Sequence, residues 1–139
     1  GAREAGREPY IAELEREAQA LGCGDALAMT EPTDAIARAY AASDLVLQLS
    51  RKPEAFGRTV LEALSCARPV VGWAHGGVGE LLAQLQPEGA VPPFDRVALA
   101  HAARALVTRA PARAGTMPDT LRAMQEATLA VYDEFDDDN

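Results

Sequence analysis

Apolar and polar positions follow two different periods along this 139-residue chain. In some segments apolar residues recur every three or four positions with charged residues between them, which predicts amphipathic helices. In shorter segments apolar residues follow one another directly, which predicts buried strands. The expected helices are 9–21, 34–42, 57–67, 78–85, 95–109 and 118–135, and the expected strands are 26–30, 44–49, 69–73 and 90–91.

These helices and strands alternate, which predicts an α/β fold with a Rossmann-like parallel sheet and flanking helices. Segments 44–49 and 69–73 are apolar at nearly every position, as in strands whose two faces are both covered. Open sheets of this class usually have about five or six strands. We therefore expect a single domain, 1–139, that lacks its first strands, and whose unpaired sheet edge favours self-association.

Composition narrows the class of partner. The net charge of −8 argues against nucleic acid, because a phosphate backbone requires a basic surface. Cys23 and Cys66 are too few for a disulfide framework or a metal site, and fit free thiols in a reducing compartment. No apolar run approaches the roughly 20 residues that span a bilayer. The expected location is therefore the cytoplasm.

Two carboxylates, Glu54 and Glu62, lie eight residues apart across the boundary between an expected loop and an expected helix. Glu54 precedes the Phe56–Gly57 turn, and Glu62 lies in the second turn of the helix that Gly57 and Arg58 open. The unpaired N–H groups at a helix start attract phosphate, while carboxylates accept hydrogen bonds from hydroxyl groups. The arrangement predicts a ligand with both a sugar and a phosphate, namely a nucleotide sugar.

Two further motifs follow along the chain. Residues 68–71 read Arg-Pro-Val-Val at the next expected strand, and residues 75–80 read His-Gly-Gly-Val-Gly-Glu where the next expected helix begins. Three glycines in four residues let a backbone approach a ligand closely, although a plain turn would also use them. His75 has no metal-ligand partner at a useful spacing, so a structural role is expected for it.

In this order, on strand, loop, helix, strand and glycine-rich loop, the motifs resemble the retaining glycosyltransferases of family 4, which have the two-domain GT-B architecture. The resemblance covers nearly the whole chain and matches the C-terminal, donor-binding domain of that family, from the loop after its second strand. Residues 50–59, Ser-Arg-Lys-Pro-Glu-Ala-Phe-Gly-Arg-Thr, are most similar to bacterial transferases that assemble lipopolysaccharide and related surface glycans.

The resemblance implies a role for each matching position in the glutamate motif. Glu54 corresponds to the catalytic-site glutamate that faces the donor sugar and accepts from its hydroxyls. Phe56 and Gly57 belong to the turn whose backbone N–H groups contact the sugar. Arg58 and Thr59 occupy the helix start, near the diphosphate.

Three more positions are implied to contact the nucleoside. Glu62 corresponds to the glutamate that holds the ribose hydroxyls. Thr30 and Glu31 correspond to a loop that borders the nucleobase, where relatives commonly have glycine in place of Glu31.

The resemblance also implies the reaction and the partners. The complete protein would transfer a sugar, with retention at the anomeric carbon, from a nucleotide-sugar donor to a glycan or lipid-linked acceptor. The acceptor domain and the basic phosphate ligands of the family lie upstream of Gly1, so the isolated chain is expected to be inactive. No metal or other cofactor is expected, because the nucleotide sugar is a substrate. Peripheral association with the cytoplasmic face of the inner membrane fits such an acceptor.

Several alternatives stay open. The two glutamates could be helix-capping and surface charges, or the acid and nucleophile of a hydrolase. Arg51 and Lys52 are either solvated loop charges or ligands of the diphosphate. For the function, the alternatives are a non-catalytic nucleotide-sugar-binding module and an unrelated flavodoxin-like interaction domain. The latter would not need Glu54, Glu62 or the glycine-rich loop.

Overall fold

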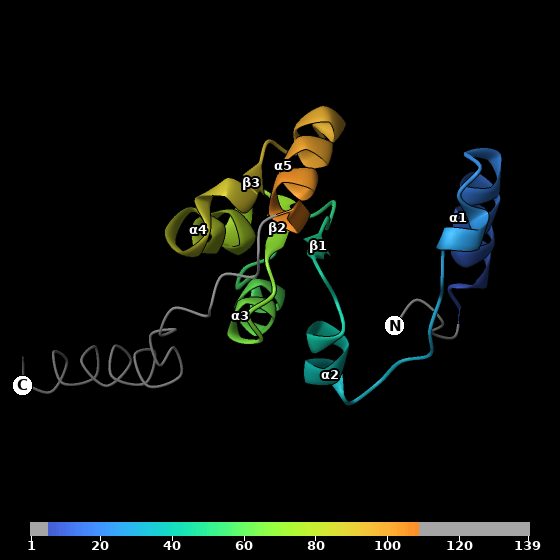
Figure 1. Cartoon of the computed structure of the whole chain (residues 1–139), viewed down its shortest axis with the longest axis horizontal. Helices are drawn as coiled ribbons and strands as arrows, with labels where there is room; N and C mark the ends of the chain where they lie inside the picture. The colour runs from blue at the N-terminus through green and yellow to red at the C-terminus, as the bar shows by residue number, and fades with distance from the viewer. Residues whose placement is uncertain (1–5, 109–139) are drawn as a thin grey trace, which may run out of the picture. The chain divides into compact units, whose positions relative to one another are not determined.

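The computed structural model describes residues 6–108, and the chain divides into two units between Ile36 and Ala37. The first unit contains helix α1 (Glu8–Ala20) and the short 3₁₀ helix η1 (Gly24–Ala26) (Figure 1). Helix α1 confirms the helix expected at 9–21 to within one residue. After its end, the N–H of Cys23 donates to the carbonyl of Ala18 over 2.9 Å, which closes the turn into η1.

The second unit is built on a parallel sheet, as the alternation of helices and strands predicts. Strands β1 (Val46–Gln48), β2 (Val70–Trp73) and β3 (Ala90–Val91) are ordered β1-β2-β3 (Figure 1). Both pairs are parallel, with Val46 opposite Val70 and Gly72 opposite Ala90. All three strands fall where the sequence predicts strands.

Helices cover both faces of this sheet. They are α2 (Ile36–Ala41), α3 (Arg58–Ser65), α4 (Gly76–Leu85) and α5 (Arg96–Thr108), with the 3₁₀ helix η2 (Pro87–Gly89) between α4 and β3. On one face, β2 packs with α2, α3 and α4 through a core of Tyr40, Val60, Ala63, Val70, Val78 and Leu82. On the other face it packs with α5 through Val71, Trp73, Val91 and Leu106.

The alternation of side chains along β2 explains this division. Val70 faces the α3–α4 core, whereas Val71 and Trp73 face α5, as the period of two requires. Every residue of β2 is buried, which confirms the sequence-based expectation for 69–73. The same expectation is wrong for β1, because Leu47 is half exposed. In the described sheet β1 is an edge strand, and β2 is its central one.

The side chain of Gln86 completes the hydrogen bonding at the start of β2. Its Oε1 accepts from the N–H of Val70 over 3.0 Å, and its Nε2 donates to the carbonyl of Val70 over 2.8 Å. Pairing between β2 and β3 begins only at Gly72, so the Gln86 amide occupies the place of a strand neighbour at Val70. Buried backbone groups require such partners.

Two further expectations from the sequence are wrong. Segment 26–30 is not a strand: η1 ends at Ala26, and the segment pairs with none of the three described strands. A strand needs a hydrogen-bonded neighbour, and an apolar run alone does not supply one. The glycines at 76–79 are not a turn ahead of a helix at 78–85, since α4 already begins at Gly76. The helix expected at 118–135 lies outside the described residues, and the single domain 1–139 stays a prediction.

Candidate functional site

The loops that follow the three strands meet at one edge of the sheet. Parallel strands have their carboxyl ends on the same side, and ligands of open α/β sheets bind there. The loop 49–57 follows β1, residues 74 and 75 follow β2, and residues 92–95 follow β3. The glutamate motif starts in the first of these loops and continues into α3.

Glu54 is held in place by Gln48, the last residue of β1. The Nε2 of Gln48 donates to Oε1 of Glu54 over 2.8 Å, and both side chains are partly buried. The Oε1 of Gln48 also accepts from the N–H of Ser50 over 3.2 Å, which fixes the orientation of the amide. One carboxylate oxygen of Glu54 is therefore held by a hydrogen bond. The carboxylate has further lone pairs, so it can accept additional hydrogen bonds.

The glycines of α4 form the platform on which this loop lies. The N–H of Gly77 donates to the carbonyl of Glu54 over 2.7 Å. A Cβ atom on Gly77 would lie 2.5 Å from the carbonyl oxygen of Ala55, and one on Gly76 would lie 2.6 Å from that of Glu54. Only glycine lets the two backbones approach this closely. Gly76 and Gly77 are thus required by the loop that holds Glu54, and the contact of the glycine motif with a ligand stays a prediction.

Gly57 turns the loop into α3. It caps the helix in the left-handed conformation, with φ 57° and ψ 35°, and a Cβ there would lie 2.9 Å from the carbonyl oxygen of Gly77. No side chain in the described part of the chain caps this helix start. Phe56 and Arg58 beside it are exposed, and Thr59 is half-buried. The start of α3 can therefore receive an anion.

Glu62 is held in the second turn of α3 by Tyr40 of α2. The Tyr40 hydroxyl donates to Oε2 of Glu62 over 3.0 Å, while Arg58 lies 3.7 Å from Oε1. The Arg58 contact is weak, because the guanidinium is largely exposed and precedes its partner along the helix. Burial, and then the hydrogen bond to Glu62, raise the pKa of Tyr40 above 10.0. At neutral pH Tyr40 therefore keeps its proton and donates a hydrogen bond to Glu62. The Glu62 carboxylate can still accept further hydrogen bonds.

His75 links the loops after β1 and β2. Its Nε2 lies 3.1 Å from the carbonyl oxygen of Ser50, and the ring is half-buried. A hydrogen bond at this distance requires that Nε2 carry the proton, because a carbonyl only accepts. The contact supports the structural role that the sequence favours for this residue.

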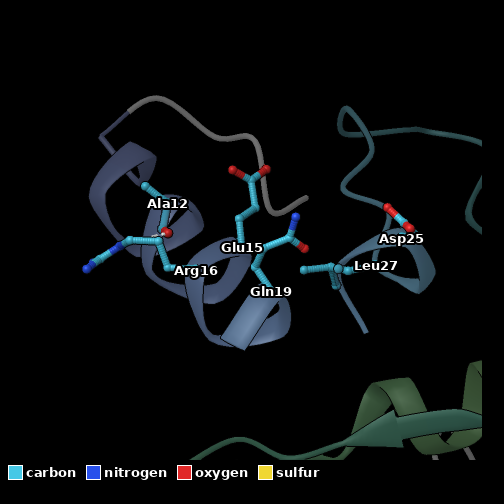
Figure 2. A pocket seen from close by; sticks show the side chains of 7 residues that line it. Ala12, Glu15, Arg16, Gln19, Asp25 and Leu27 are labelled. Carbon is cyan, nitrogen blue, oxygen red and sulfur yellow. Dashed lines mark hydrogen bonds between the residues drawn. The ribbon is translucent and has the colours of Figure 1, made fainter. Parts of the chain in front are cut away.

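Thr30 and Glu31 belong to the first unit, where both are exposed. Their assignment to the nucleobase stays a prediction. The first unit has an open hollow of its own between α1 and the segment that follows it (Figure 2). Neither Thr30 nor Glu31 lines this hollow, which is bordered by Ala12, Glu15, Arg16, Gln19, Gly24, Asp25 and Leu27.

No group of three His, Cys, Asp or Glu side chains in residues 6–108 is arranged to hold a metal ion. None of the helices in the same range combines the length and the apolar character that crossing a bilayer requires.

Sequence reasoning missed the two residues that hold the glutamates. Gln48 could have been found, since it is the one polar position within the apolar run from Leu45 to Leu49. A polar side chain at the carboxyl end of such a strand needs a partner. Tyr40 gave no comparable signal, because aromatic residues are common on the apolar face of a helix.

Comparisons with known proteins agree with this geometry. The family described as glycosyl transferases group 1 matches residues 5–117. A 2-deoxystreptamine N-acetyl-D-glucosaminyltransferase of Streptomyces fradiae is 32% identical over 141 residues, which cover 91% of this chain and 33% of that protein. An N-acetyl-alpha-D-glucosaminyl L-malate synthase of Bacillus anthracis is 45% identical over 49 residues, 35% of this chain and 13% of that protein.

The chain is also similar to a solved structure, that of Anabaena HepE in complex with UDP-glucose. The TM-score is 0.68 at 30% identity, and the match covers 75% of this chain and 29% of that chain. The predicted fold class, a parallel α/β sheet with flanking helices as in GT-B glycosyltransferases, is confirmed by this neighbour. The chain spans about a third of the length of HepE and of the Streptomyces relative.

Proposed function

Since this chain belongs to the glycosyl transferases of group 1, we propose that it binds a nucleotide sugar and that the protein that contains it transfers this sugar to an acceptor. One observation supports this more than any other. Two carboxylates lie on either side of the start of α3, and each is held by its own neutral partner, Gln48 for Glu54 and Tyr40 for Glu62. Carboxylates that are held in place in this way suit a site where they accept hydrogen bonds from the hydroxyls of a bound ligand.

In this proposal each residue of the glutamate motif contacts one part of the nucleotide sugar. Glu54 accepts from hydroxyls of the transferred sugar, and the backbone N–H groups of Phe56 and Gly57 contact the same sugar. Glu62 accepts from the ribose hydroxyls.

The remaining predicted residues serve the diphosphate and the base. Arg58 and Thr59, at the uncapped start of α3, face the diphosphate, where the helix dipole and an exposed guanidinium favour negative charge. Thr30 and Glu31 border the nucleobase. The resemblance of the motif supports these assignments, and the position of each residue in the second unit is compatible with them.

The similar proteins support a uridine diphosphate donor. The HepE structure contains UDP-glucose, and both similar enzymes are named for N-acetylglucosaminyl groups. We therefore take UDP-glucose and UDP-N-acetylglucosamine as the first donors to test.

We propose that transfer retains the configuration at the anomeric carbon, as in the family that the glutamate motif resembles. The departing diphosphate would be stabilised by the start of α3 and by Arg58, which act as donors placed in advance. Neither a metal nor another cofactor is required in this scheme. The two free cysteines fit a cytoplasmic location, because a reducing compartment keeps thiols unpaired.

Two acceptor classes have support. Residues 50–59 resemble transferases of lipopolysaccharide and surface glycans, which favours a glycan or lipid-linked acceptor and peripheral association with the inner membrane. The names of the two similar enzymes contain 2-deoxystreptamine and L-malate, which favours a small polar acceptor. The remaining alternative is a module that binds the donor without catalysis, and sugar transfer by the protein as its gene encodes it would exclude that alternative.

The test compares two isosteric variants, Glu54→Gln and Glu62→Gln, by calorimetric titration with UDP-glucose and with UDP. Glu62→Gln should weaken both ligands about tenfold or more, since hydrogen bonds to a charged group contribute about 1.5–3 kcal/mol. Glu54→Gln should weaken UDP-glucose and leave UDP unchanged, because UDP has no sugar for Glu54 to hold.

Asp44→Asn is the matched control. Asp44 is exposed and precedes β1, so it lies at the opposite, amino edge of the sheet, and its substitution should change neither affinity. An equal loss of UDP and UDP-glucose affinity for Glu54→Gln would show that Glu54 does not face the sugar.

A further inference from the structure

Phe94 occupies a backbone conformation that favours glycine. It is the third residue of the turn 92–95, which is closed by the N–H of Asp95 donating to the carbonyl of Pro92 over 3.1 Å. Its φ is 67°, the sign required at this position of a type II turn. A bulky residue in the left-handed region is strained and uncommon.

Burial does not offset this strain. The Phe94 side chain is 57% exposed, although its ring is fixed on one side by two neighbours. The buried Trp73 ring lies 5.8 Å away at 51°, and the His75 ring lies 6.2 Å away at 82°, edge to face. Strained residues that persist in a fold tend to cluster at sites of function. The strained turn therefore presents a rigid aromatic face to solvent at the carboxyl edge of the sheet.

A continuous series of contacts joins this ring to the glutamate motif. The Phe94 ring contacts His75, whose Nε2 lies against the carbonyl of Ser50. The N–H of Ser50 donates to Gln48, and Gln48 donates to Glu54. Phe94, in the turn after β3, and Glu54, in the loop after β1, therefore belong to one connected group of residues that spans this edge of the sheet.

We propose that Phe94 is a specificity-determining residue of the donor site, with its ring against the C–H face of the transferred sugar. This inference rests on the proposed function. A pyranose has hydroxyls around its edge and C–H groups on its faces, so a complete sugar site combines polar acceptors with an apolar surface. Glu54 supplies the acceptor and Phe94 supplies the surface. An aromatic ring held in advance loses little conformational freedom on binding.

The experiment measures the dissociation constants of UDP-glucose, UDP-N-acetylglucosamine and UDP for the protein as its gene encodes it. The variants are Phe94→Gly, which removes the ring and suits the positive φ, and Phe94→Tyr, which keeps the ring. The exposed Val107, near the end of α5, gives the control variant Val107→Ala. The decisive quantity is the affinity for each sugar nucleotide divided by the affinity for UDP, because a change in the folded fraction cancels in this ratio.

For Phe94→Gly we expect the ratio to fall roughly two- to tenfold, the range of a single aromatic contact, with the UDP affinity unchanged. Phe94→Tyr and Val107→Ala should keep the wild-type ratio. An unchanged ratio in Phe94→Gly, with UDP and UDP-glucose still bound, would overturn the role of Phe94 and leave the proposed function intact. If the unaltered protein binds none of the three ligands, the proposed function fails and this inference fails with it.

Discussion

The hydroxyl of Tyr40 donates a hydrogen bond to Glu62 across 22 positions of sequence, over 3.0 Å. The Tyr40 ring lies in the core beside Val60 and Leu82, whereas the Glu62 carboxylate reaches the surface of α3. A side chain that the proposed function needs at the ligand is therefore positioned by a residue of the core. The same hydrogen bond makes the contribution of Tyr40 to the free energy of unfolding depend on pH.

Tyr40→Phe should make the free energy of unfolding less dependent on alkaline pH. Burial and the bond to Glu62 raise the pKa of Tyr40 above 10.0 in the folded protein. The folded state thus keeps the proton longer than the unfolded state, so this stabilisation is complete below about pH 10 and is lost as the pH rises through the folded pKa. Urea denaturation from about pH 7 to about pH 11 should show a steeper decline for the unaltered protein than for the variant. Parallel curves would contradict the coupling.

At neutral pH the same variant should lose about 0.5–1.5 kcal/mol of stability, the contribution of one hydrogen bond. It should also weaken UDP binding a few-fold, because Glu62 is no longer held in place. A loss of stability with unchanged UDP affinity would show that Tyr40 serves the core and does not position Glu62.

Gln86→Ala should destabilise the protein by about 2–4 kcal/mol, since it leaves two buried backbone groups of Val70 without partners. Gln84→Ala is the matched control: Gln84 is exposed near the end of α4, two residues before Gln86, and its loss should change the free energy of unfolding by less than about 0.5 kcal/mol. Urea denaturation of both variants measures the difference. Equal destabilisation by the two substitutions would show that the Gln86 amide does not take the place of a strand neighbour at Val70.

Gly77→Ala tests the platform under the Glu54 loop. Inside a helix, alanine is ordinarily more stable than glycine by about 0.5–1 kcal/mol. Here the new Cβ would lie 2.5 Å from the carbonyl oxygen of Ala55, so the loop must move and the bond from Gly77 to Glu54 is strained. We expect a lower melting temperature together with weaker UDP-glucose binding. A stabilised variant with unchanged affinity would show that the two backbones do not meet.

Ala67→Gly should stabilise the protein by up to about 1 kcal/mol, because Ala67 has a φ of 56° where glycine has no steric penalty. Ala67 follows the end of α3, where its N–H and that of Arg68 donate to carbonyls of the last turn. Ala83→Gly, at an exposed position inside α4, should instead destabilise by about 0.5–1 kcal/mol. Thermal denaturation distinguishes the two signs, and destabilisation by Ala67→Gly would contradict the strained helix end.

The sequence alone determined the elements whose signals are local. The apolar run at 69–73 predicts a doubly covered strand, and the observed strand β2 (Val70–Trp73) is buried throughout. The placement of Glu54 in a loop and of Glu62 in the second turn of α3 follows from the glycine that opens the helix. Helical and extended periods, turn residues and helix starts act over a few positions, so they can be read directly from the chain.

Only the tertiary structure decided which residues hold the site together. The partners Tyr40 and Glu62, or Gln86 and Val70, are 22 and 16 positions apart, and no local pattern relates them. Segment 26–30 has the composition of a strand but pairs with none of the described strands, because a strand depends on a neighbour. The glycines at 76–79 form a motif in the sequence, but Gly76 and Gly77 must be small because the loop at Glu54 packs directly against them. Contacts between distant segments are set by packing of the whole unit, and that information is not contained in any single stretch of sequence.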